Sequence, residues 1–324
     1  MQGRFKFQDM EANDNRGELD VATNAAKMLI HILRTFEKIS PFVTLQFNPD
    51  HILLSVINTT MTMFAVVRFD SCFFARYALF NIALSNNALS NNGGEDNNED
   101  NYGLKLDTLL LANALRCDGV HNNTLLLLKD DCIELHRQVE GGTQLITLYF
   151  EVVDFIHAVT PPMHSYEGNL LVAMGSLWHK MISLHHHSPT GTQVQLDISS
   201  NNLTLLTMDK VSTQNSMPSS SFHTWKVQQP IKLVAPLSEL LLISSLADKA
   251  LLQMRFGQGL PLIVEMVTMG GCLARFIISV IEGELRDVNQ RIVHHRKKRT
   301  YRNTPREDYE KTDELEAMLE DDDF

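Results

Sequence analysis

The sequence is poor in the features of secreted or zinc-binding proteins. It has only four cysteines in 324 residues, and no two of them form a Cys-x-x-Cys pair. This spacing argues against a zinc site, and the small number argues against a disulfide framework. We therefore expect buried, reduced thiols in a protein of a reducing intracellular compartment. The cysteines are Cys72, Cys117, Cys132 and Cys272.

Long apolar runs are also missing. No stretch approaches the ~20 consecutive apolar residues that a membrane-spanning helix needs. The first residues, Met1–Phe7, alternate as a strand does and lack the apolar core of a signal peptide. These absences predict a soluble protein.

The motifs of common enzyme classes are absent as well. There is no Walker loop, no Gly-x-Gly-x-x-Gly before a helix, no nucleophile elbow and no His-Glu-x-x-His. The run His185-His186-His187 suggests a metal, but adjacent histidines on a helix point in different directions and no acidic residue lies one turn away. We expect structural or surface histidines, with no metal and no cofactor.

Charge is unevenly distributed. The formal net charge is −11, which is atypical of a nucleic-acid binder. The acidic residues gather in an Asn-rich segment and at the end of the chain, whereas 294–302 is strongly basic. Local charge is therefore more informative than the average.

The stretch Ala25–Ser40 has the pattern of an amphipathic helix. Its apolar residues recur at three- and four-residue spacing, and so do its basic residues on another face. Such a helix is either a solvated surface helix or one that packs on a sheet and presents its basic face to a polyanion. The apolar set is Ala25, Met28, Leu29, Ile32, Leu33 and Phe36, and the basic set is Lys27, His31, Arg34 and Lys38.

A unit of one helix followed by strands occurs twice in the first half of the chain. Polar residues 11–20 connect a first strand to the first helix, and Asp107 is the expected cap of the second helix, with Leu109, Leu110, Ala114 and Leu115 facing inward. The expected strands are Arg4–Met10, Phe42–Phe47, His51–Asn58, Thr62–Asp70, Thr124–Lys129, Cys132–Val139 and Gln144–Val153, and the second helix is Lys105–Cys117.

The same unit returns twice in the second half. Leu177, Met181 and Leu184 are the expected inward residues of the third helix, and Met217–Phe222 is an expected polar loop. The expected helices are Gly175–His187 and Pro236–Ala247, and the strands are Asn169–Met174, Gln193–Ile198, Leu203–Met208, Lys226–Val234, Ala250–Phe256, Pro261–Thr268 and Cys272–Ile281.

Four similar units predict an α+β fold of two similar domains, each with helices on one face of antiparallel sheets. We place the first domain at 1–154, with a mobile Asn-rich insert at 85–101. An aperiodic segment with a Pro-Pro pair, 155–168, is the interdomain connector. The second domain is 169–285, and a flexible basic-then-acidic tail covers 286–324.

The order of these parts resembles the DNA sliding-clamp superfamily. Gly259–Glu265, Leu273–Ile278 and Ile281–Glu284 resemble the end of proliferating cell nuclear antigen (PCNA). Leu109–Asn122, with Ala-Leu-Arg-Cys-Asp-Gly at its centre, resembles a clamp helix. Phe155–Tyr166 falls where these clamps have their interdomain connecting loop. The resemblance covers residues 4 to 284 in organisation and implies a clamp that assembles into a ring by edge-strand pairing.

The first domain departs from PCNA. Its Phe73-Phe74-Ala75-Arg76-Tyr77 is similar to a Phe-Phe-x-x-Tyr element of the checkpoint clamp, the heterotrimeric nine-one-one complex. Arg4–Phe7 and Leu45–Asp50 also resemble its Hus-one-type subunit. The Phe-Phe element equally fits an ordinary core strand with a helix-like end.

In a clamp, the helices of all units line a central hole and their basic side chains contact DNA phosphates without reading sequence. The fourth helix offers only Lys249, which Glu239 and Asp248 oppose. A sparse lining implies weak holding and sliding, with ring closure keeping the clamp on DNA. A solvated face is the alternative for each residue. The residues that the resemblance places in the hole are Lys27, His31, Arg34, Lys38, Arg116 and Lys180.

The resemblance also implies partners. Peptides of replication or repair proteins dock on the connector and the pocket beneath it, and a clamp loader opens the ring. Here the connector carries His157 and His164 in place of acidic groups common in PCNA, so partner choice differs. Its expected partner-binding residues are Phe155, Ile156, Val159 and Met163.

The tail divides in two. Its basic cluster is a nuclear import signal or a DNA-contacting arm. Glu307–Phe324 is acidic, with apolar Leu315, Met318, Leu319 and Phe324, and is a partner-binding helix or disordered. The expected import residues are Arg296, Lys297, Lys298, Arg299 and Arg302.

These observations predict a nuclear, non-enzymatic clamp subunit that encircles double-stranded DNA and tethers checkpoint and repair factors. The first alternative is a divergent homotrimeric PCNA, acting as a polymerase processivity factor in replication. The second is an enzyme with a repeated α+β fold and a site that the motifs do not reveal.

Overall fold

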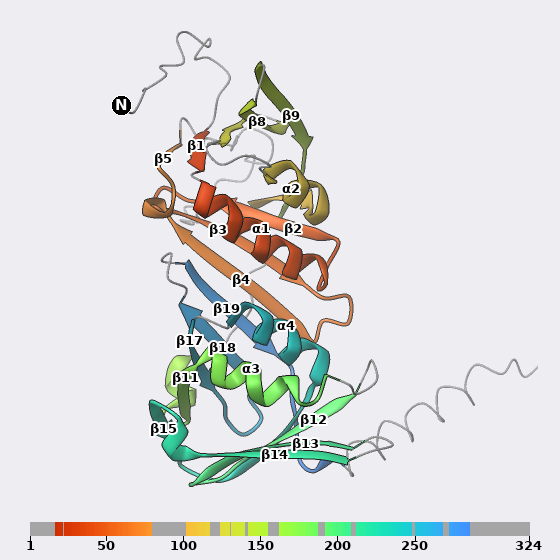
Figure 1. The fold of residues 1–324 in the computed structure, drawn as a ribbon, viewed down its shortest axis with the longest axis vertical. Helices are drawn as coiled ribbons and strands as arrows, with labels where there is room; N and C mark the ends of the chain where they lie inside the picture. The colour runs from red at the N-terminus through yellow and green to blue at the C-terminus, as the bar shows by residue number, and fades with distance from the viewer. Residues whose placement is uncertain are drawn as a thin grey trace, which may run out of the picture.

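A computed structural model describes residues 17–21, 23–79, 102–116, 124–129, 131–139, 142–154, 162–186, 192–208, 212–247, 250–267 and 272–285. These residues form three antiparallel sheets and four α-helices. The helices lie together on one face of the central sheet (Figure 1). Within the described ranges, no helix is both long and apolar enough to cross a membrane.

The central sheet is continuous from one half of the chain to the other. β4 pairs with β19, from Cys272↔Phe69 to Ile278↔Met63, and this pairing joins the two halves. In order, its ten strands are β10 (Glu151–Asp154), β6 (Tyr102–Asp107), β2 (Phe42–Phe47), β3 (His51–Ile57), β4 (Met63–Asp70), β19 (Cys272–Ile278), β18 (Leu262–Val267), β17 (Leu251–Arg255), β11 (Leu170–Met174) and β15 (Thr224–Lys226).

A five-stranded sheet lies at each end of the molecule. The edge strands β9 and β14 are therefore at opposite ends (Figure 1). The first sheet runs β5 (Arg76–Leu79), β1 (Gly17–Val21), β7 (Thr124–Leu128), β8 (Cys132–Val139) and β9 (Gly142–Tyr149). The second runs β14 (Ser212–Pro218), β13 (Asn202–Met208), β12 (Gln193–Ile198), β16 (Ile231–Pro236) and β20 (Ile281–Glu282).

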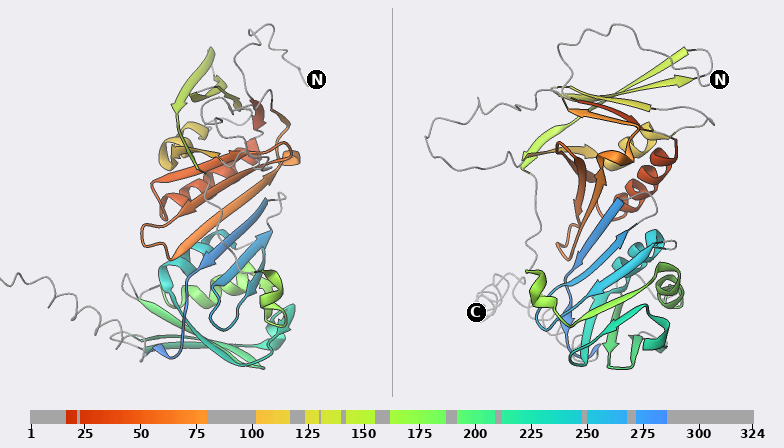
Figure 2. Two further views of the ribbon diagram at one scale, coloured as in Figure 1. Left: turned by 180° about the vertical axis from the view of Figure 1, so that it is seen from behind. Right: turned by 90° about the vertical axis from the view of Figure 1, so that its left-hand side faces the viewer.

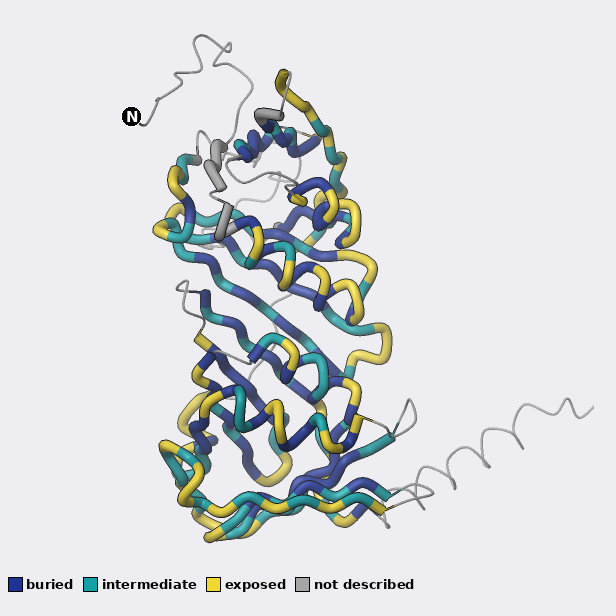
Figure 3. The backbone as a smooth tube through the Cα atoms, viewed as in Figure 1, coloured by how far each residue is buried: buried dark blue, intermediate teal, exposed yellow. Residues whose placement is uncertain are grey.

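The helices pack in pairs between the sheets. α1 (Thr23–Glu37) contacts α2 (Thr108–Leu115), α3 (Gly175–Ser183) contacts α4 (Leu237–Ala247), and α1 also contacts α4. Apolar side chains from the helices and from the facing side of the sheets form one core. The backbone of buried residues is dark blue in Figure 3. Each large side chain buried there contributes about 1.5–3 kcal/mol. Short 3₁₀ turns lie at Ser71–Phe73, Met163–Tyr166 and Ser219–Ser221.

In α1, buried and exposed residues alternate with the helical period that the sequence predicts. Leu29, Ile32, Leu33 and Phe36 are buried, whereas the four basic residues are exposed. The helix packs on the sheet through its apolar side, as the second interpretation of this stretch requires. The views in Figure 2 show the helices on one side of the molecule and the sheet on the other.

The expected helix 105–117 is wrong at its start. Residues up to Asp107 form β6, in which Lys105 pairs with Thr44. Asp107 is the cap, as predicted, since its carboxylate accepts from the Leu110 amide at 2.8 Å. Of the four apolar positions expected in this helix, Ala114 and Leu115 are buried, whereas Leu109 and Leu110 are exposed. The residues that it buries are Thr108, Leu111, Ala112, Ala114 and Leu115.

Expectations for two connecting segments and for one inward residue are also wrong. The expected connection 11–20 overlaps strand β1, which pairs with β5 and β7. The expected loop Met217–Phe222 overlaps β14, whose polar alternation gives no apolar signal. Leu184 is exposed because α3 ends at Ser183, and Trp178 and Ile182 occupy the core beside Met181.

The strand at 4–10, the insert 85–101 and the tail 286–324 lie outside the described residues.

Two expected strands are each divided between two sheets. Residues 144–153 belong to β9 of an end sheet and β10 of the central sheet, and the break between them is at Phe150. The expected strand 226–234 is likewise divided, since Lys226 ends β15 and Ile231 begins β16. The chain changes sheet at Phe150 without a break in the apolar pattern, whereas Gln228-Gln229-Pro230 interrupts the pattern before β16.

The cysteines divide between core and surface. Cys132 and Cys272 are buried and unbridged, as expected, and burial raises the pKa of the Cys132 thiol. Cys72 is exposed in the turn after β4, contrary to expectation. Cys117 lies outside the described residues.

Candidate nucleic-acid interface and partner pocket

The helical face carries a stripe of basic residues on α1. Lys27, His31 and Arg34 lie on α1, and Lys38 is the first residue after it. They follow at four, three and four residues, so the stripe is about 16 Å long along the helix axis. All four side chains are exposed. Within the described part of the chain, none of them has a carboxylate partner. The stripe is therefore available to phosphate groups.

Arg116 follows the last turn of α2 and is exposed. Its backbone is held by a second arginine from β8. The buried Arg137 guanidinium donates to the Arg116 carbonyl at 2.6 Å and to the Ala114 carbonyl. A cation at the C-terminal end of a helix interacts favourably with the helix dipole. Arg137, which sequence reasoning misses, therefore fixes the position from which Arg116 projects.

On α3, Lys180 and His179 are exposed side by side. His185, just past the helix, is buried. Its Nδ1 lies 3.0 Å from Thr207 Oγ1, and its Nε2 lies 3.2 Å from Asn215 Oδ1. This histidine is structural, as expected, and His187 lies outside the described residues. No cluster of three potential metal ligands occurs in the described ranges.

The four helices differ in charge. α4 has no basic residue, and its exposed positions include Ser238 and Ser245. α2 exposes Leu109 and Leu110. From its sequence position Glu239 is expected to oppose the positive lining, but it is buried and points away from this face. The basic side chains therefore concentrate on α1, the end of α2 and α3.

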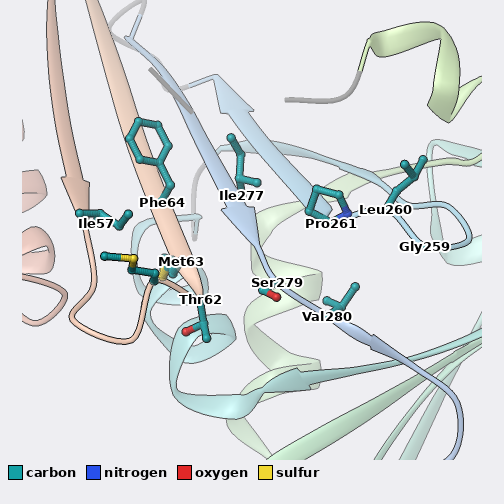
Figure 4. Close-up of a pocket in the computed structure, with 11 residues that line it drawn as sticks. Ile57, Thr62, Met63, Phe64, Gly259, Leu260, Pro261, Ile277, Ser279 and Val280 are labelled. Carbon is teal, nitrogen blue, oxygen red and sulfur yellow. The ribbon is translucent and has the colours of Figure 1, made fainter. Parts of the chain in front are cut away.

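A pocket of about 320 Å³ lies where the two halves of the chain meet. One wall is the turn between β3 and β4, and the other comes from Gly259–Pro261 and the end of β19 (Figure 4). Ile57, Phe64 and Ile277 line it from three neighbouring strands and lie in direct cross-strand register. Its surface is mixed, since Thr62 and Ser279 lie among the apolar side chains. Pockets lined by apolar side chains with a few polar groups are typical binding sites.

The described end of the predicted connector is anchored beside this pocket. The buried Tyr166 donates from its hydroxyl to the Pro261 carbonyl at 3.1 Å. Burial raises the pKa of Tyr166 to about 12, so the hydroxyl keeps its proton at neutral pH. Met163 is exposed in the same 3₁₀ turn. Phe155, Ile156 and Val159 lie outside the described residues.

Solved structures of known proteins share this architecture. No protein-family model matches the sequence, and no curated protein matches it either. A PCNA2–PCNA3 complex from Sulfolobus tokodaii, however, superposes with a TM-score of 0.63 at 15% identity, covering 81% of this chain and 98% of that one. The chain has the PCNA fold.

PCNA structures from two further organisms agree. The Thermococcus kodakaraensis protein gives a TM-score of 0.61 at 14% identity, over 82% of this chain and 100% of that one. PCNA from Entamoeba histolytica gives 0.65 at 12% identity, over 82% and 99%. The expected α+β clamp architecture is thereby confirmed. At such low identity the PCNA likeness establishes the fold alone.

Proposed function

We propose that this chain is a non-enzymatic DNA clamp subunit that encircles duplex DNA without reading its sequence. The observation that carries the proposal is the exposed basic stripe on α1, on the helical face of a PCNA fold. Residues 1–154 and 169–285 are its two domains, and 155–168 is the connector. With so few phosphate contacts the clamp slides, and ring closure retains it. The residues that contact phosphates are Lys27, His31, Arg34, Lys38, Arg116 and Lys180.

The ring forms by edge-strand pairing, in which β9 and β14 each pair with an edge strand of a neighbouring subunit, because these edges lie at opposite ends of the chain. The two edges differ in chemistry. β9 exposes Leu145 and Tyr149, the latter to 74%, whereas the exposed residues of β14 include Gln214 and Ser216. Cross-strand pairs are stabilised by matching side chains. A ring of different subunits satisfies both edges better than a homotrimer does.

This mismatch favours the checkpoint clamp over the replicative alternative. In a heteromeric ring, β9 and β14 each meet an edge of another clamp chain. Mixed assembly is compatible with this fold, since one of the matching structures is a complex of two different PCNA chains. The proposed role is to tether DNA damage checkpoint and repair factors. A homotrimeric PCNA serving as a polymerase processivity factor in replication is the second candidate.

The partners bind at the pocket between the two halves. Apolar side chains of repair or signalling proteins enter between Phe64 and Ile277. His157 and His164 select partners other than those of PCNA. A clamp loader opens the ring. The proposed partner-binding residues of the connector are Phe155, Ile156, Val159 and Met163.

The proposed site of action is the nucleus, where duplex DNA and its repair factors are found. The basic cluster of the tail is the proposed import signal, since short runs of Lys and Arg are what import receptors bind. Its residues are Arg296, Lys297, Lys298, Arg299 and Arg302.

Light scattering on the pure full-length chain tests the assembly. We expect a monomer of 36.7 kDa that enters a ring only when two other PCNA-like chains are added. A mass three times that of the chain would favour the replicative candidate instead. A monomer that ignores such partners would overturn the clamp proposal.

A further inference from the structure

Glu239 is a buried carboxyl on a helix of the DNA-facing layer, and its hydrogen bonds reach the other half of the chain. It belongs to the first turn of α4 and is 5% exposed. Its Oε1 accepts from Thr62 Oγ1 at 2.5 Å and from Asn58 Nδ2 at 3.0 Å. Its Oε2 is buried and has no hydrogen-bond partner among the described residues. Burying an incompletely satisfied carboxyl is costly, which calls for an explanation.

Asn58 and Thr62 bracket the turn between β3 and β4 and organise it. Asn58 Oδ1 accepts from the amides of Thr62 at 2.9 Å and Met63 at 3.0 Å. Between them Met61 has φ = 54°, a left-handed conformation that is unfavourable for a side chain of this kind. The turn is thus a strained backbone held by one asparagine, and Glu239 holds that asparagine.

The same turn forms a wall of the partner pocket. Met61, Thr62 and Met63 line the pocket, and Met61 stands at its rim with 79% of its surface exposed. The Ser279 amide, on the opposite wall, donates to the Thr62 carbonyl at 2.7 Å. Figure 4 shows Thr62 between the turn and the end of β19. A shift of the Glu239 carboxylate therefore changes the shape of the pocket.

We propose that Glu239 is a positioning residue that couples α4, on the DNA-facing side, to the partner pocket by holding the Asn58–Met63 turn. The inference rests on the proposed function for what the two sites bind, whereas the contacts of Glu239 do not depend on that function. Burial raises the pKa of Glu239 and the two hydrogen bonds oppose this. The neutral acid and an amide of the same shape can both accept from Asn58 and Thr62.

Amide hydrogen exchange on the isolated full chain tests the positioning role. In Glu239→Ala, the Thr62 and Met63 amides should exchange on the order of tenfold faster, because two hydrogen bonds to the turn are removed. Glu239→Gln should restore slow exchange, since the amide oxygen replaces Oε1. Ser238→Ala, an exposed neighbour on α4, is the matched control and should change neither amide. Equal acceleration over all core strands, or no acceleration at the turn, would overturn the proposal.

Coupling must also be reciprocal. Thr62→Val keeps the side-chain shape and removes the hydroxyl, so exchange within α4 should rise although the substitution lies in the other half. Displacing α4 tests the effect in the opposite direction, from the helix to the turn. A Cβ on Gly175 would lie 1.6 Å from the Ala247 carbonyl, so Gly175→Ala should displace α4 and alter exchange at Thr62. That alteration should disappear when Thr62→Val is added.

Failure of this inference is distinct from failure of the proposed function. Exchange is measured on the chain alone, so a missing ring or missing DNA retention would overturn only the clamp proposal. If Gly175→Ala prevents folding, the contrast between Glu239→Ala and Glu239→Gln still decides the positioning role. Turn amides that do not respond to Glu239→Ala, or α4 amides that do not respond to Thr62→Val, would remove the coupling.

Discussion

The buried guanidinium of Arg137 on β8 donates to the backbone carbonyl of Ala114 at the end of α2. A second bond reaches the Arg116 carbonyl at 2.6 Å. Arg137 Nε has no partner within the described residues, so these carbonyls are the main compensation for a buried charge. Arg137 thus stabilises the end of α2 from its buried side, whereas the side chain of Arg116 is exposed.

We therefore expect different effects on stability for these two arginines. Arg137→Leu should lower the free energy of unfolding by about 1.5–3 kcal/mol, because charge-assisted hydrogen bonds to the helix end are removed. Arg116→Ala should lower stability less, since the backbone carbonyl that accepts from Arg137 is still present. Urea unfolding of both variants checks this. Equal stability of Arg137→Leu and the wild type would show that the cap contributes nothing.

The α1 stripe predicts a salt-dependent DNA phenotype. Lys27→Ala with Arg34→Ala should weaken retention on circular duplex DNA and lower the slope of log affinity against log salt by about 2, one for each phosphate that is no longer neutralised. The protein should remain folded, because both side chains are exposed. Ser238→Ala with Ser245→Ala, at exposed positions of α4, is the matched control. Unchanged retention by the α1 double variant would argue against a phosphate-binding role for that helix.

The pocket predicts a variant that separates partner binding from DNA retention. Phe64→Asp places a charge between Ile57 and Ile277 and should abolish capture of pocket-binding peptides, while retention on DNA persists. Val66→Asp is the matched control, since it lies on the same side of β4 but outside the pocket. Pull-down of peptides selected on the wild-type chain checks both. Equal loss in the two variants would point to general damage to the sheet.

Local patterns are sufficient for the elements whose apolar face is their strongest feature. α1 has an uninterrupted 3.6-residue period, and β2 and β12 have apolar residues at alternate positions, so the sequence predicts all three well. β14 escapes prediction because its half-buried positions are polar, including Thr213 and Asn215. The start of α2 is misplaced because the strand before it continues the leucine run.

Long-range contacts account for most of the remaining errors. The sequence places Glu239 on the DNA-facing side because acidic residues of a helix are usually solvated. Its burial depends on Asn58 and Thr62, which lie 181 and 177 positions away. His185 is structural, as predicted, but its partners Thr207 and Asn215 lie on strands that only the fold brings beneath α3. Sequence periodicity carries no record of such pairs.

The basic cluster of the tail predicts a change in localisation. Deleting 296–302 should shift the protein from the nucleus to the cytoplasm, because the run of Arg and Lys side chains that import receptors bind is removed. Fluorescence microscopy of the tagged chain checks this. A deletion of equal length at 307–313, in the acidic part, is the control. Persistent nuclear signal in the first deletion would remove the import hypothesis and favour a DNA-contacting arm.

Glu134 predicts a pH dependence of stability. Its carboxylate accepts from Lys129 Nζ at 2.7 Å and lies 3.1 Å from His136 Nε2. The hydrogen bond from Lys129, aided by His136, holds the pKa of Glu134 below its usual value of 4.5. A carboxyl with a lowered native pKa stabilises the fold above its unfolded pKa, and this contribution is lost as the pH falls through the native value.

Glu134→Gln should therefore be less stable than the wild type by about 1.5–3 kcal/mol at pH 7, where the charge-assisted bond is present. The difference should shrink as the pH falls below 4.5, because the wild-type carboxyl then takes up a proton and loses the same interaction. Urea unfolding from neutral pH down to about pH 3 measures the difference. Glu151→Gln, whose bond to Lys105 is more exposed, is the control and should show a smaller gap. A pH-independent difference for Glu134→Gln would mean that packing, rather than charge, accounts for its effect.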